Sequence, residues 1–271
     1  MKNFKKFVCL FAVAMMFAAC GTTSTIPVTG RKHNLLVDDS QMLSLSSQQY
    51  QQYMSKAKKS TDKQNTAMVQ RVGQRLATAV ENYLKANGFA KEVANFKWEF
   101  NLVQSKDVNA FCMPGGKIVV YEGILPVTKD ETSLAIVLGH EIAHAVAKHS
   151  AEQMSKQQRA QAGLQIGAGI LSSVSSDQNL NSVATDMAST GLSLLNLKFS
   201  RNHESEADYM GLVFAALAGY DPNAAVAFWQ RMAASSKSTT PAWMRTHPTD
   251  EKRIADIQKK YLPEALKYYK K

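Results

Sequence analysis

The feature that most constrains this chain is an apolar run at residues 134–150, LAIVLGHEIAHAVAKHS, which contains His140, Glu141 and His144. Their nearest neighbours are uncharged, which is typical of a helix buried on most sides. A buried charge without a partner costs several kcal/mol, so these three side chains require partners. Either they form a metal site, or the helix is a structural one whose histidines are satisfied by other groups.

The spacing of the three residues favours the metal site. Residues four positions apart lie on one helical face, so His140 and His144 can present two imidazole nitrogens to one ion. Catalytic zinc needs three protein ligands and an open position for water, whose pKa falls to about 7. Glu141 is one position further round and can act as general base, passing the water's proton to a leaving amine. The pattern predicts a zinc hydrolase that still lacks a third ligand.

A third ligand decides the class of such a site. One class places a histidine six positions after the second histidine, with a glycine between them, but this chain has Ser150 there and no glycine at 147. We expect His149 to project away from the site to the surface. The segment SRNHESEAD offers Glu204 and Asp208 on one helical face, so we assign Glu204 as third ligand and Asp208 as a hydrogen-bond partner of a ligating histidine. An acidic first turn favoured by the helix dipole is the alternative.

The N-terminus predicts export. Residues 1–19 place three lysines before an apolar run, which is shorter than the about 20 residues of a membrane-spanning helix, and two alanines precede Cys20. The pattern resembles a bacterial lipobox with Phe17 in place of the usual leucine, and it predicts a lipid anchor on Cys20. An ordinary signal peptide is the alternative. Because Gly21 rather than aspartate follows, we expect an outer-membrane lipoprotein that faces the periplasm.

Cysteine content and charge exclude other classes. Cys9 and Cys20 belong to the signal and its end, so only Cys112 remains, and a packed core rather than a disulfide must stabilise the protein. The formal net charge is +10, but the basic residues are dispersed and no dense basic run is interleaved with aromatic residues. We therefore expect no nucleic-acid partner.

The remaining segments indicate a helical protein with a small sheet. Residues 20–39 predict a tether, and residues 40–87 carry apolar positions at helical spacing. NFKWEFNLVQS alternates with the period of a half-buried strand, and KIVVYEG predicts a second strand after a turn at Pro114 and two glycines. Residues 163–195 are apolar but broken by glycines, which favours either buried helices or a mobile lid.

Five segments carry a family resemblance: VTGRK, VNAFCMPGGKIVVYEGIL, HEIAH, SRNHESEAD and THPTDEKRI. Together they resemble the gluzincin zinc metallopeptidases of the CAAX prenyl protease type, most closely the periplasmic lipoprotein branch. The resemblance spans residues 26–260. It implies an α+β, mostly helical, zincin-like catalytic domain, here expected over residues 40–271, with a small antiparallel sheet whose edge strand lines the cleft. Multi-pass membrane spans are missing, so prenylated substrates are not implied.

The resemblance also implies roles for residues. Glu141 is the catalytic glutamate, and Glu204 joins His140 and His144 in binding one zinc ion per chain. His247 approaches the open zinc position or stabilises the oxyanion, with a surface histidine as the alternative. A substrate peptide is expected to add as an antiparallel strand along an edge formed by Lys117, Ile118, Val119, Val120 and Tyr121.

These expectations define the function. We expect a zinc endopeptidase that hydrolyses misfolded or misassembled cell-envelope proteins, attached to the membrane by a lipid on Cys20. The alternative is an outer-membrane protein assembly factor or chaperone with restrained proteolysis, which works with the assembly machinery.

Overall fold

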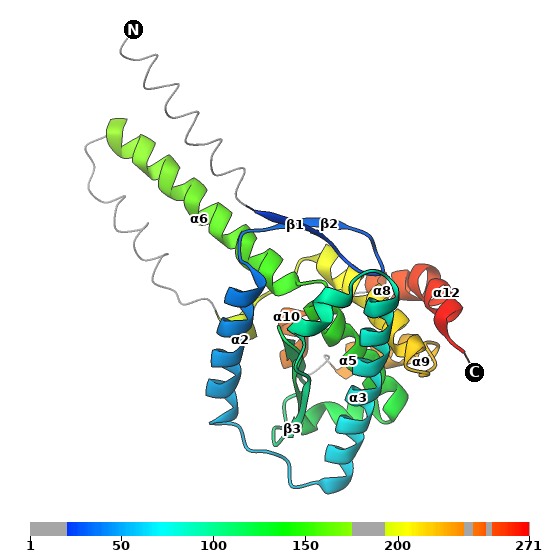
Figure 1. The fold of residues 1–271 in the computed structure, drawn as a ribbon. Helices are drawn as coiled ribbons and strands as arrows, with labels where there is room; N and C mark the ends of the chain where they lie inside the picture. The colour runs from blue at the N-terminus through cyan, green and yellow to red at the C-terminus, as the bar shows by residue number, and fades with distance from the viewer. Residues whose placement is uncertain (1–20, 175–192, 236–240, 248–250, 271) are drawn as a thin grey trace. The chain divides into compact units, whose positions relative to one another are not determined.

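The computed structural model describes residues 21–174, 193–235, 241–247 and 251–270. Internal contacts divide the described residues into two compact units: residues 21–25, 31–38 and 151–174, and residues 26–30 and 39–150 with the described residues from 193 to 270. Figure 1 labels most of their helices and strands. The export signal and Cys20 lie outside the described residues. The lipid anchor and the single catalytic domain over 40–271 therefore stay predictions.

The first unit pairs a strand hairpin with a long helix. Strands β1 (Thr22–Thr25) and β2 (Lys32–Leu35) are antiparallel. Helix α6 (His149–Val174) belongs to this unit from Ala151 onward, and Arg31 donates two hydrogen bonds to Glu152 at its start. The helix continues through Gly163, so the first part of the glycine-broken segment is helical. No helix among the described residues is both long enough and apolar enough to cross a membrane.

The second unit is built on two central helices, α5 (Glu131–Val146) and α8 (Arg201–Leu217). Asp130 caps α5 by accepting a hydrogen bond from the Ser133 N–H at 2.7 Å, and Ser200 caps α8 by accepting one from the His203 N–H at 3.2 Å. The remaining longer helices are α2 (Asp39–Met54), α3 (Lys63–Ala86) and α9 (Ala224–Ser235).

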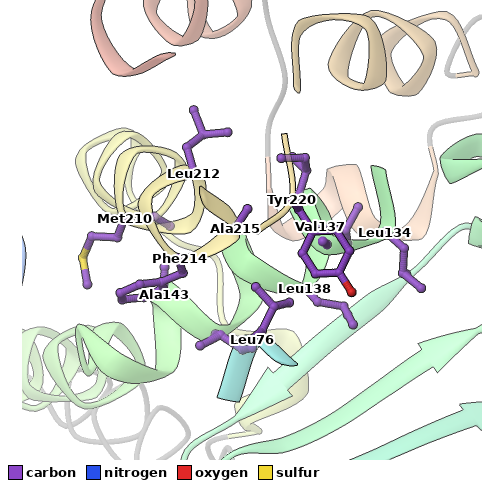
Figure 2. Packing of buried hydrophobic residues seen from close by; sticks show 14 of the residues in the cluster. Leu76, Leu134, Val137, Leu138, Ala143, Met210, Leu212, Phe214, Ala215 and Tyr220 are labelled. Carbon is purple, nitrogen blue, oxygen red and sulfur yellow. The ribbon is translucent and has the colours of Figure 1, made fainter. Parts of the chain in front are cut away.

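A glycine pair lets α5 and α8 touch backbone to backbone. A Cβ atom on Gly139 would lie 2.6 Å from the carbonyl oxygen of Gly211, and one on Gly211 would lie 2.6 Å from the amide nitrogen of His140. Any side chain at either position would therefore separate the helices. Figure 2 shows apolar side chains from both helices packing together with Leu76 of α3. This core fixes the distance between the histidines of α5 and the carboxylates of α8.

The three-stranded sheet corrects one expectation. It has the order β3 (Glu99–Val103), β5 (Lys117–Tyr121), β4 (Ala110–Met113), with β3 parallel and β4 antiparallel to β5. The prediction that residues 117–121 form the edge for an added strand is wrong, because both sides of β5 are already hydrogen-bonded. Strand β4, which the sequence analysis missed, is one of the two edges of the sheet and lies next to α5. The sheet is mixed, within an α+β fold that is mostly helical, as predicted.

Short elements complete the second unit and place its last residues. Lys148 follows α5 with a φ of 55° and forms ion pairs with Asp39 at 2.7 Å and Glu92 at 2.9 Å. The short helices and turns are η1 (Ala90–Asn95), η2 (Glu122–Ile124), α4 (Leu125–Thr128), η3 (Leu194–Asn196), α10 (Ala242–Thr246), α11 (Glu251–Asp256), the π-helical η4 (Ile257–Tyr261), α12 (Leu262–Ala265) and η5 (Leu266–Tyr268).

Candidate metal centre

Four predicted residues converge in one buried cluster. His140 and His144 come from α5, Glu204 comes from the first turn of α8, and His247 caps the end of α10. Each offers one ligand atom, and these atoms all lie within 4.8 Å of one another. Nε2 of His144 lies 3.1 Å from Nε2 of His140 and 3.4 Å from a carboxylate oxygen of Glu204. Nδ1 of His247 lies 2.9 Å from the same Glu204 oxygen, Oε1.

Asp208 stands where the helical-face argument places it. Its Oδ1 lies 3.0 Å from Nδ1 of His140, while Nε2 of that ring faces the cluster. Arg253, from α11, was not identified from the sequence. It donates to both oxygens of Asp208, at 2.7 and 2.8 Å, and its Nη1 lies 3.1 Å from Oε2 of Glu204. The guanidinium also stacks over Trp229 at 4.2 Å. One cation therefore ties Glu204 and Asp208 together.

Glu141 lies beside the cluster rather than in it. Its Oε1 accepts a hydrogen bond from the indole N–H of Trp243 at 2.7 Å and lies 3.7 Å from Nε2 of His247. The residue is 2% exposed. Trp243 was also missed by sequence reasoning. The indole fixes the orientation of a carboxylate that the zinc-hydrolase pattern assigns as a base.

The electrostatics keep the carboxylates ionised. Burial alone raises the pKa of Glu204, but the charges and hydrogen bonds of His247, His144 and Arg253 outweigh burial and hold this pKa well below its usual range. The pKa of Asp208 is lowered in the same way, with Arg253 and His140 outweighing burial. For His144, burial lowers the pKa well below its usual value, which favours the neutral imidazole that a metal requires.

These residues fit a zinc ion. Two imidazole nitrogens and one carboxylate oxygen are a known donor set of catalytic zinc. Oε2 of Glu204 is buried and accepts no hydrogen bond among the described residues, although Arg253 lies near it. Glu204 and Asp208 share the single positive charge of Arg253, and a divalent cation can balance the negative charge that remains. His247 also responds to this charge: burial lowers its pKa, but Glu204 and Glu141 outweigh burial and raise it.

A cleft of about 310 Å³ opens onto Glu141, His144 and His247. Strand β4 and the adjoining turn form one wall, and an apolar segment that precedes α8 forms another. The lining residues of these walls are Asn109, Ala110, Phe111, Cys112, Met113, Pro114, Leu194, Leu195, Leu197 and Phe199. Among the described strands, none pairs with the outer side of β4, so an extended peptide has a free strand edge next to the cluster.

The expected surface position of His149 is wrong. His149 is 0% exposed, and its Nδ1 lies 2.9 Å from Nδ1 of His144. The expectation counted residues along one continuous helix. Instead α5 ends at Val146 and α6 begins at His149, with Lys148 in the left-handed region between them. The break turns the imidazole back toward the ligands.

A paired-histidine helix and a second helix that supplies a carboxylate define a zincin-like zinc metallopeptidase. The model of peptidase family M48 matches residues 63–261, which is more than half of the chain. The chain belongs to peptidase family M48.

Curated relatives agree with this assignment. The chain is 39% identical over 175 residues to the mitochondrial metalloendopeptidase OMA1 of Schizosaccharomyces pombe, covering 64% of this chain and 49% of that protein. It is 30% identical over 251 residues to metalloendopeptidase OMA1 of Bos taurus, covering 89% and 46%. A putative beta-barrel assembly-enhancing protease of Vibrio cholerae is 31% identical over 166 residues, covering 59% and 34%. The chain thus spans about half the length of these relatives or less.

Proposed function

We propose that His140, His144 and Glu204 bind the zinc ion and that Glu141 is the general base of peptide hydrolysis. The observation that carries this proposal is the buried cluster of ligand atoms next to an oriented glutamate in a cleft. When bound, zinc supplies a Lewis acid and an acidified water. Glu141 takes the proton of the attacking water and delivers it to the leaving amine. The Trp243 N–H holds the Glu141 carboxylate in place. Asp208 orients the His140 ring.

We further propose that the substrate is an unfolded polypeptide that adds as a strand to β4. Main-chain hydrogen bonds along β4 recognise an extended backbone with little dependence on sequence. The outer edge of β4 and its position on the cleft wall support this choice over β5. Apolar side chains such as Phe111 and Phe199 favour apolar substrate residues near the scissile bond.

The export pattern ending at Cys20 and the likeness to a putative beta-barrel assembly-enhancing protease support a role in the bacterial envelope. We propose a lipoprotein of the CAAX prenyl protease type, in the periplasmic lipoprotein branch, at the outer membrane. It removes misfolded or misassembled envelope proteins.

One observation favours the second candidate, an assembly factor with restrained proteolysis. His247 lies within the ligand cluster, with Nδ1 2.9 Å from Glu204, so it can compete for the position that water needs. In that case client binding at β4 continues while cleavage is held back. The two candidates differ in the effect of removing this imidazole.

The experiment compares zinc content and casein cleavage for the whole 271-residue chain, Glu141→Gln and His247→Ala. The first candidate predicts about one zinc per chain by stoichiometry, cleavage by the wild type, and a Glu141→Gln variant that keeps zinc but does not cleave. The second predicts an inert wild type and an active His247→Ala variant. If the wild type and His247→Ala both bind zinc but neither cleaves casein, both candidate functions are contradicted.

A further inference from the structure

A chain of polar contacts leads from His144 away from the ligand cluster. Nδ1 of His144 lies 2.9 Å from Nδ1 of His149, and Nε2 of His149 lies 3.0 Å from Oε2 of Glu206. The other oxygen of Glu206 accepts a hydrogen bond from the hydroxyl of Thr29 at 2.6 Å. His149 and Glu206 are both buried. The donor set and the acid-base chemistry described above use none of these last three residues.

The contacts allow one consistent arrangement of hydrogens when His144 is a ligand. Its Nε2 faces the other ligand atoms, so the ring hydrogen lies on Nδ1 and is donated to His149. Nδ1 of His149 must therefore accept, and its own hydrogen lies on Nε2. That hydrogen points at Glu206, which accepts it. Each step of the chain needs the particular nitrogen or oxygen that the structure places there.

The hydrogen-bonded series that starts at His144 resembles the contact made by the other histidine ligand, His140. Asp208 contacts Nδ1 of His140 directly, at 3.0 Å. On His144 a second imidazole is inserted between the ligand ring and the carboxylate. Carboxylate partners of ligating histidines fix ring orientation and raise the basicity of the ligand nitrogen.

We propose that His149 and Glu206 are positioning residues that hold His144 for zinc, with Thr29 anchoring Glu206. This inference rests on the proposed role of His144 as a ligand. It also gives a function to the VTGRK segment. Ile26 is buried in the core, and the Gly30 N–H donates to the Ile26 carbonyl oxygen at 3.0 Å in a turn that presents Thr29 to α8.

A purely structural role is the competing explanation. The His149 ring stacks on His203, with centroids 4.4 Å apart, and a buried pair with Glu206 can stabilise the fold without affecting the metal. The two explanations differ in what they predict for substitutions that keep one nitrogen position of His149 and remove the other.

Asparagine and glutamine make this comparison. The amide of asparagine can place its oxygen near the position of Nδ1, where it accepts from His144, whereas the amide of glutamine reaches the position of Nε2, next to Glu206. We therefore test His149→Asn, His149→Gln and His149→Leu in the whole chain. The readout is zinc affinity, measured by competition with a chelator, together with the visible absorption spectrum of the cobalt-substituted protein and the melting temperature of the metal-free protein.

We expect His149→Leu and His149→Gln to weaken zinc binding by about 10- to 100-fold, the range for lost partners of ligand histidines. His149→Asn should remain closer to the wild type. His33→Leu is the matched control, because His33 is another buried histidine whose Nδ1 contacts a carboxylate, that of Glu152, in the first unit. Its zinc affinity should equal that of the wild type.

Glu206→Gln provides a second and milder test. If Glu206 acts through His149, this substitution weakens zinc binding in the wild-type background but adds nothing in the His149→Leu background. Unchanged zinc affinity in His149→Leu, His149→Gln and Glu206→Gln, with only the melting temperature lowered, overturns the proposal. A wild-type chain that binds no zinc contradicts the proposed function instead, so the two failures are distinguishable.

Discussion

Arg253 allows the sharpest test of how the metal centre is held together. The guanidinium donates to both oxygens of Asp208 and lies 3.1 Å from Glu204, and all three groups are buried. Substitution by methionine keeps much of the side-chain volume but leaves two buried carboxylates without their cation. Removing one partner of a buried ion pair costs about 3–5 kcal/mol, because an uncompensated charge stays behind.

We expect metal-free Arg253→Met to lose about 3–5 kcal/mol of unfolding free energy at neutral pH. The measurement is urea unfolding with a chelator present, followed by tryptophan fluorescence, with the denaturant slope compared to confirm that only stability changed. The unfolding free energy of Arg253→Lys should lie between those of the wild type and Arg253→Met, because lysine keeps the charge but not the bidentate contact with Asp208. Arg71→Met is the control, because Arg71 pairs with Glu131 on the surface, and it should match the wild type.

The pH dependence of the stability difference between the wild type and Arg253→Met provides a further test. The pKa values of Asp208 and Glu204 are lowered in the folded protein, so their contribution to stability is present above their unfolded pKa values and is lost as pH falls through the folded ones. Arg253→Met removes one cause of this lowering. The stability difference from the wild type should therefore be largest near neutral pH and narrow in acid. A difference of less than about 1 kcal/mol at neutral pH, the size of a surface pair, refutes the reasoning.

Three further substitutions probe other parts of the molecule. Gly139→Ala should destabilise the protein by about 1–3 kcal/mol in urea unfolding, since its methyl group has no room against Gly211; an unchanged midpoint contradicts the tight crossing. Trp243→Phe removes a hydrogen bond of about 1.5–3 kcal/mol to the Glu141 carboxylate and should lower kcat/KM about 10- to 100-fold at unchanged zinc content; equal activity rules out this orienting role. The pKa of Lys148 is raised, because its two carboxylate partners outweigh burial, so Lys148→Met should cost about 1 kcal/mol at pH 7. The Lys148 contribution is present below the unfolded pKa of about 10.4 and disappears as pH rises through the folded value, so a constant difference up to strong alkali contradicts it.

The part of the site that the sequence predicted is the part fixed by local geometry. His140 and His144 are four positions apart within one helix, and so are Glu204 and Asp208 in another. Their common faces follow from helix geometry before any tertiary contact forms. The need of buried charges for partners then joins the two helices into one cluster. For these four residues, residue spacing and the cost of burial were sufficient, whereas His247 was predicted only by the family resemblance.

The missed residues depend on tertiary packing instead. Arg253 is 45 positions from Asp208, and Trp243 is 102 positions from Glu141. No periodicity connects residues so far apart. One signal was available: a buried Asp208 carboxylate needs a cation as its partner. That argument demands an arginine or lysine somewhere in the chain, but it cannot choose among the 32 such residues present.

The prediction that residues 117–121 form the edge strand is wrong, although the sequence contains a pattern that argues against it. In KIVVY the three residues Ile118, Val119 and Val120 are consecutive and apolar, and all three are buried in the structure. Continuous apolar runs are typical of strands covered on both faces, which are usually central. The run therefore argued for a strand paired on both sides. The edge strand must then be a neighbour of this central strand. That neighbour is β4, whose four residues lie between Asn109 and the turn at Pro114. A strand of four residues is too short to show a clear period-two alternation, so the sequence pattern did not reveal it.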